Sequence, residues 1–516
     1  MNSLKRQILI FTVISAAIME LIDISIVNVA LSHMSGNLGS TLADTSWVVT
    51  SYAIANVIVI PMSSFLSTSL GRRTYYIGSV ILFTICSFMC GNASNIWVLV
   101  FFRFLQGLGG GALLSVSQTI MFELFPKEKQ SMASALFGLG VFIGPTIGPT
   151  LGGFITENFS WPWIFYINIP VGIAVILSCL LLLQESPIKQ TVKKIDWTGI
   201  LLLIIGVSTL QTVLERGQEE DWFDTTYITV FTVIAIAAIT LFIIWELQVD
   251  EPVVNLRVFK SRTLTVAAIL TFITGIGMFT SVYLTPVFAQ RLLGFTPLET
   301  GLLLLPGSFF ALLSLIISGR LLQNGLSPVV MIVIGFTLFI YFSYTMATLS
   351  TDASAQLISG NLIYRAVGIA LLTVPLTMLA VSTLEMKDIP QGAALNNMMR
   401  QLGGSFGIAI VNTYTARRSA YHRNHLVADL NPDNPAVTER LNGYAHYFLS
   451  HGSTPGTAHQ RALGLLEYGV VKQSTLLSYL DSFALVGILF LACLPLLFMV
   501  QKRNTPALAL KNIQDH

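Results

Sequence analysis

Residues 138–153 read G-L-G-V-F-I-G-P-T-I-G-P-T-L-G-G and decide what kind of fold this chain can adopt. Gly140, Gly144, Gly148 and Gly152 recur every fourth residue, which places them in one row on a helix surface. In water the segment would not hold as a helix, because glycine costs about 1 kcal/mol and proline about 3 kcal/mol relative to alanine. In lipid, a helix is the only way for a single segment to satisfy its own backbone. The stretch therefore predicts a membrane-spanning helix.

Two roles are open to this helix. A row without side chains lets another helix approach closely, backbone against backbone. Pro145 and Pro149 each follow one of the glycines, and proline removes a helical hydrogen bond and bends the helix. One interpretation is a conformational hinge at the seam between two moving halves. The other is a small-residue packing face that takes no part in motion.

The composition of the whole chain is that of a membrane protein. Of its 516 residues, 53% are hydrophobic and only 10% are charged, whereas soluble proteins contain about 25% charged residues. The net charge of +2 gives no reason to expect a nucleic-acid partner. We find no phosphate-binding loop, zinc spacing or nucleophile elbow. We therefore expect no enzyme, no metal and no cofactor, and an ion gradient as the energy source.

Windows of about 20 apolar residues predict about fourteen membrane spans. The approximate spans are 8–31, 45–67, 75–93, 97–120, 132–155, 163–184, 197–215, 226–247, 263–287, 298–319, 329–349, 356–384, 393–416 and 482–501. With the N-terminus inside, the cytoplasmic loops hold most of the basic residues: Lys5, Arg6, Arg72, Arg73, Lys127, Lys129, Lys189, Lys193, Lys194, Arg257, Lys260, Arg262, Arg320 and Lys387, with Lys502, Arg503 and Lys511 after the last span. This asymmetry predicts that both termini are cytoplasmic.

The spans group as six, two and six. Arg103 lies in the fourth span and Arg365 in the twelfth, and a glycine-rich helix follows each of them. This parallel placement predicts two related six-helix halves with two extra spans between them. The predicted units are an N-terminal bundle over 1–184, two linker helices over 185–262, and a C-terminal bundle over 263–516 that includes an outer arm at 417–475.

Several motifs resemble one family of drug exporters. The residues Gly144, Pro145, Gly148, Pro149, Gly152 and Gly153 resemble the antiporter motif in the fifth helix of exporters of the major facilitator superfamily. The strings 161–172, 221–223 and 402–405, together with Arg400, resemble the EmrB-type subgroup of the fourteen-span drug:proton antiporters. The resemblance covers nearly the whole chain. It implies an all-α major facilitator fold of two six-helix bundles plus two extra central helices, with a fifth helix that governs which way the cavity opens.

Two acids in the first span are candidates for proton coupling. Glu20 and Asp23 are three residues apart and share one helix face. Placing a charged side chain inside a bilayer costs several kcal/mol of free energy unless it is paired or in contact with water. Two carboxylates so close are not expected to ionise together, so one could accept and release a proton near neutral pH. Alternatively, Asp23 only bonds neighbouring helices. Asp23 and Asn28 match the first-helix motif of the antiporter family, whereas Glu20 lies outside it.

A third proton-coupling candidate, Arg103, lies in the string R-F-L-Q-G-L-G-G-G at 103–111. Arg103 and Gln106 are three residues apart and share a face. The arginine stays charged in any protein environment, so it can influence a nearby carboxylate but cannot carry the proton itself. The string resembles the fourth-helix motif of the same exporters, in which this arginine is implicated in proton transfer. The alternative is a structural ion pair.

The loop after the second span predicts a cytoplasmic gate formed by Gly71, Arg72 and Arg73. The superfamily carries Gly-x-Leu-x-Asp-x-x-Gly-Arg-Lys at this place. Gly71 and Arg72 match the pattern and Arg73 stands for its lysine, but Thr68 replaces its acid. We therefore expect a helix dipole or another acid to take the place of the missing carboxylate.

Polar and aromatic residues of the later spans predict a substrate cavity. The predicted lining consists of Asn28, Gln106, Phe279, Tyr283, Arg365, Asn396, Asn397, Arg400 and Gln401. Aromatic faces can hold cationic or flat ligands, whereas the two arginines favour an anion such as a fatty acid or bile salt. Alternatively, these polar groups only form hydrogen bonds between helices.

The segment 417–475 is not apolar enough to span the membrane. Asn431-Pro432 and Asn434-Pro435 indicate a turn between two helical arms. One interpretation is a docking arm for a periplasmic partner, and the other is a solvated cap over the outer mouth. Its histidines are irregularly spaced, which argues against a metal site.

Together these observations predict a proton-driven exporter of amphipathic toxic compounds in the bacterial inner membrane. The resemblance implies work with a periplasmic membrane-fusion adaptor and an outer-membrane channel. The alternatives are a dedicated exporter of a physiological lipid, fatty acid or metabolite, and a transporter-like sensor or scaffold. The glycine row and the membrane acids argue against a scaffold, which needs neither.

Overall fold

The computed structural model describes residues 3–126, 129–185, 195–350, 353–385, 388–431 and 433–499. Its elements are α1 (Ser3–Leu38), α2 (Leu42–Leu70), α3 (Arg72–Gly91), α4 (Ile96–Leu124), α5 (Gln130–Asn158), α6 (Trp163–Tyr166), α7 (Asn168–Leu182), α8 (Trp197–Arg216), η2 (Trp222–Asp224), α9 (Thr226–Gln248), η3 (Leu256–Lys260), α10 (Arg262–Leu293), α11 (Pro297–Gln323), α12 (Pro328–Met346), α13 (Ala355–Ser382), α14 (Ile389–Ala428), α15 (Pro435–Ser450), α16 (Pro455–Cys493) and η4 (Leu494–Met499). Several basic residues of the predicted cytoplasmic loops lie outside the described residues, namely Lys127, Lys189, Lys193, Lys194, Lys387, Lys502, Arg503 and Lys511.

Side-chain caps set where several helices begin. The side chain of Asn95 accepts a hydrogen bond from the backbone of Val98 at the start of α4 (3.0 Å). Thr296 and Glu299 form a capping box at the start of α11, and each such cap is worth about 1 kcal/mol. Short polar loops that carry these cap residues separate the apolar segments. For this reason the hydropathy pattern located the helices.

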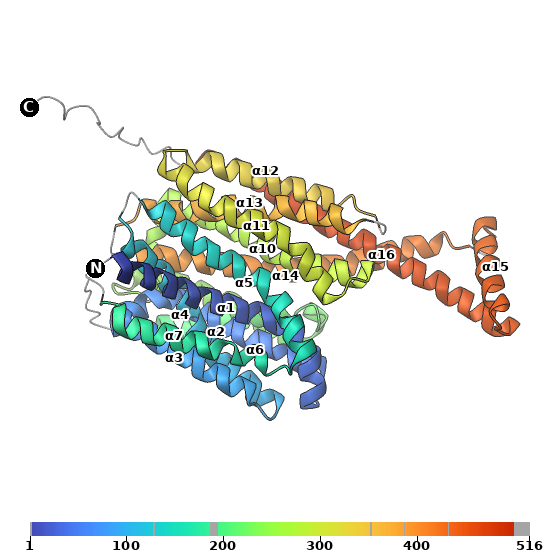
Figure 1. Cartoon of the computed structure of the whole chain (residues 1–516), viewed down its shortest axis with the longest axis horizontal. Helices are drawn as coiled ribbons and strands as arrows, with labels where there is room; N and C mark the ends of the chain where they lie inside the picture. The colour runs from blue at the N-terminus through green and yellow to red at the C-terminus, as the bar shows by residue number, and fades with distance from the viewer. Residues whose placement is uncertain are drawn as a thin grey trace, which may run out of the picture.

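Thirteen helices of the described residues are long and apolar enough to cross a membrane. α14 is also long, but its membrane part carries asparagines, a glutamine and an arginine, which lower its hydropathy. It nevertheless runs through the bundle between α2, α4, α10 and α16 (Figure 1). With α14 included, the predicted all-α membrane fold of about fourteen spans is confirmed. The residue boundaries of the three predicted units remain a prediction.

The helices form two groups that meet along α5. The first seven helices lie on one side of the bundle and α10–α14 with α16 on the other (Figure 1). α5 packs against α1 of its own group and against α11 and α13 of the other, while α14 packs against α2 and α4. α1 begins at the same end of the bundle at which α16 finishes (Figure 1). The seam between the two groups therefore consists chiefly of α5, α11, α2 and α14.

Phenylalanines fill the core of the second group. The rings of Phe339 on α12 and Phe490 on α16 are stacked, with centroids 4.1 Å apart. Phe336, Phe342 and Phe483 surround this pair, and all five side chains are at most 2% exposed. Because such aromatic packing fixes the helices around it, the polar residues on α13 and α14 are held by a rigid support.

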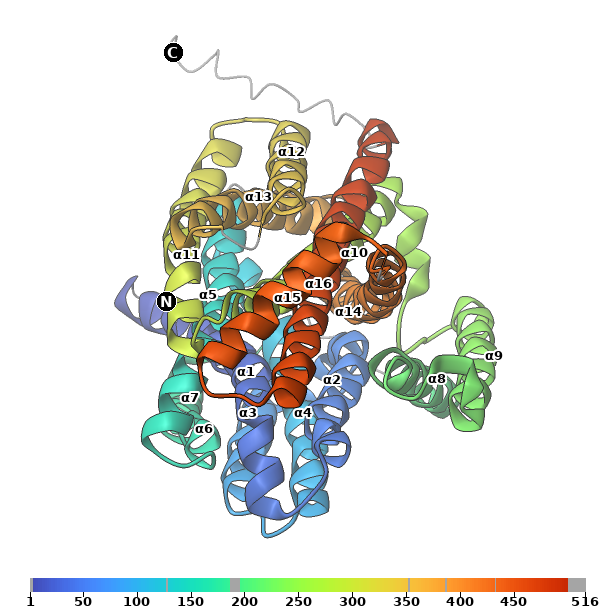
Figure 2. The same cartoon turned by 90° about the vertical axis from the view of Figure 1, so that its right-hand side faces the viewer.

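The two extra helices form a pair at the side of the bundle (Figure 2). α8 contacts both α2 and α14. Arg216 on α8 donates to Ser46 on α2, and Gln211 on α8 donates to Ser405 on α14 at 2.9 Å. α8 therefore bridges the two groups from outside.

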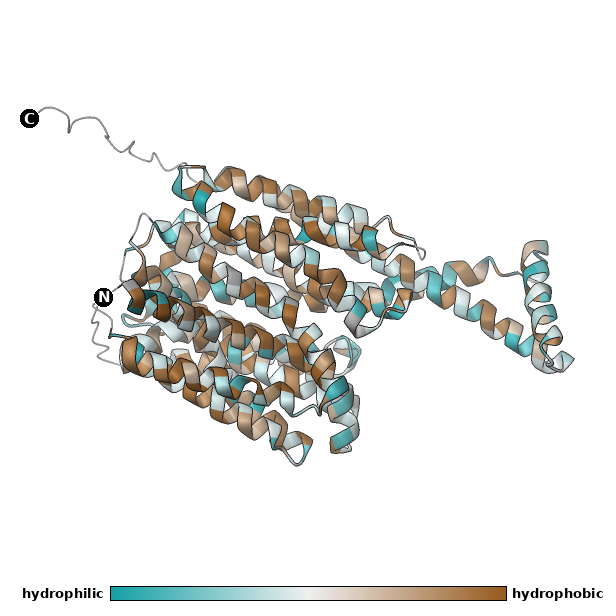
Figure 3. Ribbon diagram, in the orientation of Figure 1, coloured by the Kyte–Doolittle hydropathy of each residue, from teal (hydrophilic) through white to brown (hydrophobic). Residues whose placement is uncertain are grey.

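The arm differs from the prediction in its architecture. Instead of two arms, it has three helical parts: the end of α14, all of α15 and the first half of α16. The predicted turn falls between Ala428 and Pro435, where Pro432 lies outside the described residues. α16 begins at Pro455, not near residue 482, because its helix continues unbroken from the arm into the bundle. The arm projects away from the bundle (Figure 1). Its residues are more hydrophilic than those of the bundle helices (Figure 3).

Candidate functional site

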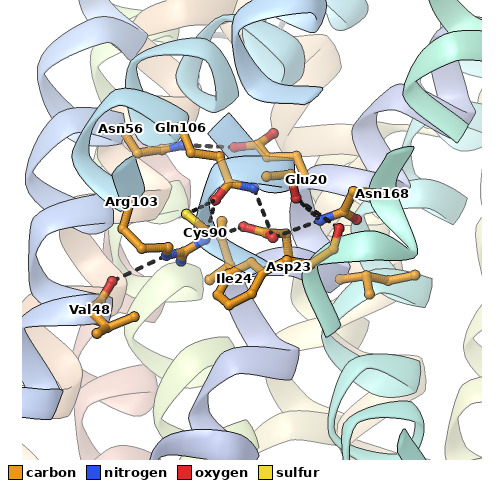
Figure 4. Close-up of polar contacts among 12 residues, drawn as sticks. Glu20, Asp23, Ile24, Val48, Asn56, Cys90, Arg103, Gln106 and Asn168 are labelled. Atoms are coloured by element: carbon orange, nitrogen blue, oxygen red, sulfur yellow. Dashed lines mark hydrogen bonds and ion pairs between the residues drawn. The ribbon is translucent and has the colours of Figure 1, made fainter. Parts of the chain in front are cut away.

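Asp23 lies at the centre of a buried polar network where α1, α4 and α7 meet (Figure 4). Its Oδ2 atom accepts a hydrogen bond from Arg103 Nη1 at 2.5 Å. Its Oδ1 atom accepts from Gln106 Nε2 at 3.1 Å and from Asn168 Nδ2 at 2.8 Å. Every side chain in this network is at most 2% exposed. Three donors, one of them a cation, therefore occupy both carboxylate oxygens of Asp23.

Arg103 is fixed by further contacts with α2. Its Nε atom donates to the carbonyl of Val48 on α2 at 3.2 Å, and its guanidinium lies over the Tyr52 ring at 4.1 Å. Glycines of α4 make this approach possible, because a Cβ at Gly107 would lie 2.6 Å from the Tyr52 carbonyl oxygen. The predicted close packing at this string thus positions the arginine beside Asp23.

Glu20 lies one turn before Asp23 and is also fully buried. Its Oε1 atom accepts a hydrogen bond from Asn56 Nδ2 on α2 at 2.8 Å. Its Oε2 atom has no hydrogen-bond partner among the described residues, and no cation contacts the carboxyl group there. The two acids therefore face the interior of the bundle but occupy opposite electrostatic environments.

Sequence reasoning missed two members of this network. Asn56 binds Glu20, and Asn168 binds both Asp23 and Ser87 Oγ, the latter at 3.0 Å. Both asparagines lie inside apolar spans and are at most 2% exposed, and a buried amide in lipid requires a partner. That signal could have found them. Asn168 follows the break at Ile167 between α6 and α7, within the string 161–172 that resembles the EmrB-type subgroup.

The glycine row of α5 packs against α1, within the same group of helices. A Cβ at Gly144 would lie 3.0 Å from the backbone carbon of Leu21, and one at Gly152 would lie 3.0 Å from the carbonyl oxygen of Ile26. Gly148 faces Ser25 in the same way, whereas a Cβ at Gly140 would come no closer than 3.3 Å to the Ile18 side chain and 3.6 Å to the carbonyl oxygen of Ile14. The row therefore brings α5 onto the helix that carries Glu20 and Asp23.

Another face of α5 contacts the second group. Ser131 Oγ donates to the carbonyl of Gly319 on α11 at 3.1 Å near one end of the seam. Gly301 of α11 lies against Thr150 near the other end. Pro145 and Pro149 lie within α5 between these contacts. α5 thus connects the acid-bearing helix with the opposite group, while its motion as a hinge remains a prediction.

The predicted gate residues lie where α2, α3, α4 and α7 converge. Gly71 has φ +82°, a conformation that favours glycine, and separates α2 from α3. Arg72 forms an ion pair with Glu123 at the end of α4. The backbone of Arg73 donates to Glu185 Oε1 at 3.2 Å. Glu123 and Glu185 were missed by sequence reasoning, although acids at the cytoplasmic ends of apolar spans were the signal to look for.

Thr68, which replaces the motif acid, takes no part in these contacts. Its hydroxyl donates to the carbonyl of Ser64 in its own helix at 2.9 Å. Arg73 also donates to the carbonyl of Leu180 on α7 at 2.7 Å. The basic pair therefore binds carboxylates and carbonyls of its own helix group in place of the missing acid.

The predicted cavity residues lie in several separate parts of the structure. Gln106 belongs to the Asp23 network. Asn28 is exposed and is placed 3.4 Å from the carbonyl of Ile24 in its own helix. Tyr283 is 39% exposed and Gln401 is half-buried. These four residues do not form one surface.

The remaining cavity candidates gather around α10, α13 and α14. Asn396 accepts a hydrogen bond from Thr271 on α10 at 2.8 Å, and Gly404 of α14 lies against the Phe279 ring. Asn397 Nδ2 donates to Gln118 Oε1 on α4 at 2.7 Å, which joins the two helix groups. Arg365 and Arg400, also buried, are located on α13 and α14. Among the described residues, no group of three or more His, Cys, Asp or Glu side chains could hold a metal ion.

Comparisons with known proteins show what the chain as a whole is similar to. The family model described as Major Facilitator Superfamily matches residues 13–408. The Multidrug export protein EmrB of Escherichia coli (strain K12) is 34% identical over 493 residues, which cover 94% of this chain and 93% of that protein. The Fatty acid resistance protein FarB of Neisseria gonorrhoeae is 31% identical over 493 residues, covering 94% of each chain.

Solved structures share the arrangement of helices at much lower identity. The crystal structure of the human organic anion transporter MFSD10 (TETRAN) aligns with a TM-score of 0.61 and 11% sequence identity. The alignment covers 96% of this chain and 100% of that one. At this identity, the similarity supports the fold alone.

Proposed function

The chain belongs to the major facilitator superfamily, and from this we infer that it is a multidrug exporter of the EmrB type that moves amphipathic toxic compounds out of the cell. It is a transporter and not an enzyme, and members of the family need no cofactor. Its many apolar helices make it a multi-pass membrane protein. We place it in the bacterial inner membrane with both termini cytoplasmic, since its relatives are bacterial and its short basic loops gather on one side.

Export is driven by proton entry, and Glu20 is the group that exchanges the proton. The observation that carries this proposal is the contrast between the two buried acids. Among the described residues, Asp23 has three donors, including Arg103, while Glu20 has one neutral donor and an unpartnered Oε2 atom. An ionised carboxylate needs donors or a cation in a low-dielectric site. Glu20 therefore holds a proton at rest and releases it when water reaches the site.

The packing offers a route from this acid to the cavity. Leu21, next to Glu20, contacts Gly144 of α5, and α5 contacts α11 across the seam. A charge change at Glu20 alters how α1 sits between Asn56 and α5. Protonation then favours one orientation of the cavity and substrate favours the other, which is the requirement for coupled exchange.

The test uses everted membrane vesicles that extrude a lipophilic dye under an imposed proton gradient. We expect Glu20→Gln to abolish uphill transport but to retain downhill dye exchange, because the glutamine cannot release a proton. Glu246→Gln is the matched control, since Glu246 is equally buried but lies on α9, outside both six-helix groups. Full uphill transport by Glu20→Gln would reject the assignment.

The outer arm is proposed to dock a periplasmic membrane-fusion adaptor that leads to an outer-membrane channel. Two ion pairs hold α14 and α16 together in the arm, Arg418 with Asp481 at 2.5 Å and Arg423 with Glu467 at 2.7 Å. The bond with Asp481 raises the pKa of Arg418. Tyr447 on α15 is 57% exposed, and exposed aromatic residues on a solvated arm are typical of a binding surface.

Replacement of Tyr447 and Tyr468 by alanine tests whether the arm binds the adaptor. Tyr468 is 64% exposed on α16. We expect the double variant to transport normally in vesicles but to lose resistance in cells that also express the adaptor and channel. Tyr344→Ala is the matched control, because Tyr344 is 67% exposed on α12 in the membrane region. Unchanged resistance in the double variant would contradict docking at this surface.

A dedicated exporter of a fatty acid or other physiological lipid is the second candidate. The 31% identity to a fatty acid resistance protein favours it. Resistance profiles distinguish the multidrug exporter from the lipid exporter. They are measured in cells with and without the protein, in the presence and absence of a proton uncoupler. Protection against several unrelated drugs supports multidrug export, whereas protection confined to one lipid class supports the alternative.

A further inference from the structure

The hydroxyl group of Tyr52 on α2 is buried without a partner. Tyr52 is 2% exposed, and its Oη atom has no hydrogen-bond partner among the described residues. A buried hydroxyl without a partner is unfavourable in a low-dielectric interior. The Asp23 network uses the tyrosine ring, which lies under the Arg103 guanidinium, but it does not use the hydroxyl. Tyr52 therefore keeps an unused hydrogen-bond donor inside the bundle.

This hydroxyl lies beside the side-chain amide that binds Glu20. A Cβ atom added at Gly110 of α4 would collide with Tyr52 Oη and would lie 3.4 Å from Asn56 Nδ2. Both polar groups therefore lie over the same backbone position. Asn56 Nδ2 in turn donates to Glu20 Oε1 at 2.8 Å (Figure 4). Tyr52 thus places its hydroxyl next to the group that binds one acid, while its ring contacts the arginine that binds the other.

α2 presents a row of contacts to both acids. Val48, Tyr52 and Asn56 are four residues apart and share one face of the helix. The carbonyl of Val48 and the ring of Tyr52 hold Arg103, whereas Asn56 holds Glu20. Tyr52 is the middle member of this row, so a shift of its side chain alters the surroundings of both acids.

The charged and titratable side chains around Glu20 come from α1, α2, α3 and α4. They are Asp23, Tyr52, Tyr76 and Arg103. The hydroxyl of Tyr76 is already bonded to Ser117 at 2.8 Å. α5, α6 and α7, which also pack against α1, carry Glu157 as their one charged side chain, and it lies one residue from the end of α5. Tyr52 is therefore the neighbour of Glu20 whose hydroxyl lacks a partner in the part of the chain that the structure describes.

We propose that Tyr52 is the positioning residue that couples the proton on Glu20 to the ion pair of Asp23 and Arg103. The inference rests on the proposed role of Glu20 in proton exchange. When Glu20 releases its proton to water, its carboxylate needs a donor in addition to Asn56. The Tyr52 O–H group turns to donate to it and keeps its own proton. Because the ring moves with the hydroxyl, its contact with Arg103 loosens and the ion pair is held less firmly.

Infrared titration of the carboxylic-acid C=O band in the purified full chain tests the role of the hydroxyl. Tyr52→Phe removes only the hydroxyl and keeps the ring under Arg103. Because ionised Glu20 would lose a donor, we expect the pH at which the Glu20 band disappears to rise by about one unit, a tenfold change in the proton equilibrium. The unfolding temperature should stay at the wild-type value, since the hydroxyl has no partner among the described residues while Glu20 is protonated.

Tyr75→Phe is the matched control. Tyr75 also carries a buried hydroxyl without a partner among the residues described, but it lies in the first turn of α3, beside the predicted gate. We expect this variant to titrate as the wild-type protein does. Tyr52→Leu removes the ring as well, so it should lower the unfolding temperature because Arg103 loses a contact.

Two results in Tyr52→Phe would overturn the proposal. One is a titration of the Glu20 band that stays at the wild-type pH or moves to lower pH. The other is a marked fall in the unfolding temperature, because that would show that the hydroxyl supports the fold at rest. A band that persists in Glu20→Gln would instead reject Glu20 as the proton carrier, so a failure of that assignment is recognised separately from a failure at Tyr52.

Discussion

The two acids of α1 are expected to differ strongly in how much stability the same isosteric exchange removes. Asp23→Asn and Glu20→Gln each replace one carboxylate oxygen by an amide NH2 group of almost equal size. Both side chains are fully buried, so solvent cannot compensate either change. Any difference in stability between the variants therefore reports the hydrogen-bond partners around each acid.

The contacts give the expected magnitude. Both oxygens of Asp23 accept hydrogen bonds, Oδ2 from Arg103 and Oδ1 from Gln106 and Asn168. An asparagine NH2 group would face a donor in either orientation and would leave Arg103 without a counter-charge. Breaking a buried ion pair in this way costs about 3–5 kcal/mol. In Glu20→Gln the amide oxygen can still accept from Asn56, and the NH2 group replaces the Oε2 atom, which has no partner in the part of the chain that the structure describes. The expected cost is therefore below about 1 kcal/mol.

Thermal unfolding in detergent, followed with a thiol-reactive dye, measures the difference. Cys86, Cys90 and Cys179 are free and buried, so they react only when the bundle opens. We expect a large fall in the unfolding temperature of Asp23→Asn, a small one for Glu20→Gln, and partial recovery when Asp23→Asn is combined with Arg103→Gln. Equal losses for both single variants would refute the contrast between the two acids.

Two further predictions follow from the packing. Gly144→Ala should destabilise the protein and slow transport, because its Cβ would press on the Leu21 backbone, whereas Gly140→Ala should be mild; transport rates in vesicles and thermal unfolding compare the two. Glu123→Gln should free Arg72 and increase cytoplasmic labelling of a cysteine introduced beside it, and unchanged labelling would contradict a role for this ion pair in the gate.

The sequence predicted the features that depend on local chemistry. Apolar windows located the spans, and spacing placed Glu20 and Asp23 on a common face and Arg103 with Gln106. These features could be predicted because helical periodicity and the free-energy cost of a charge in lipid depend on a single segment of the sequence. The all-α fold followed from the same rules together with the family resemblance.

What the sequence did not predict depends on contacts between distant segments. Asn168 reaches Asp23 from another helix, and Glu123 replaces the motif acid from the far end of α4. The sequence around Asn168 or Glu123 does not indicate which distant residue each of them contacts. The length of α16 was missed because the hydropathy window stops where the helix leaves the lipid, although its hydrogen bonds continue into the arm.

Infrared difference spectroscopy of the carboxylic-acid C=O band tests most directly which acid carries the proton. The account predicts that the wild-type protein shows a protonated carboxyl group at neutral pH, that Glu20→Gln removes this band, and that Asp23→Asn, combined with Arg103→Gln to preserve the fold, retains it. A band that persists in Glu20→Gln and disappears in the variant lacking Asp23 would contradict the account.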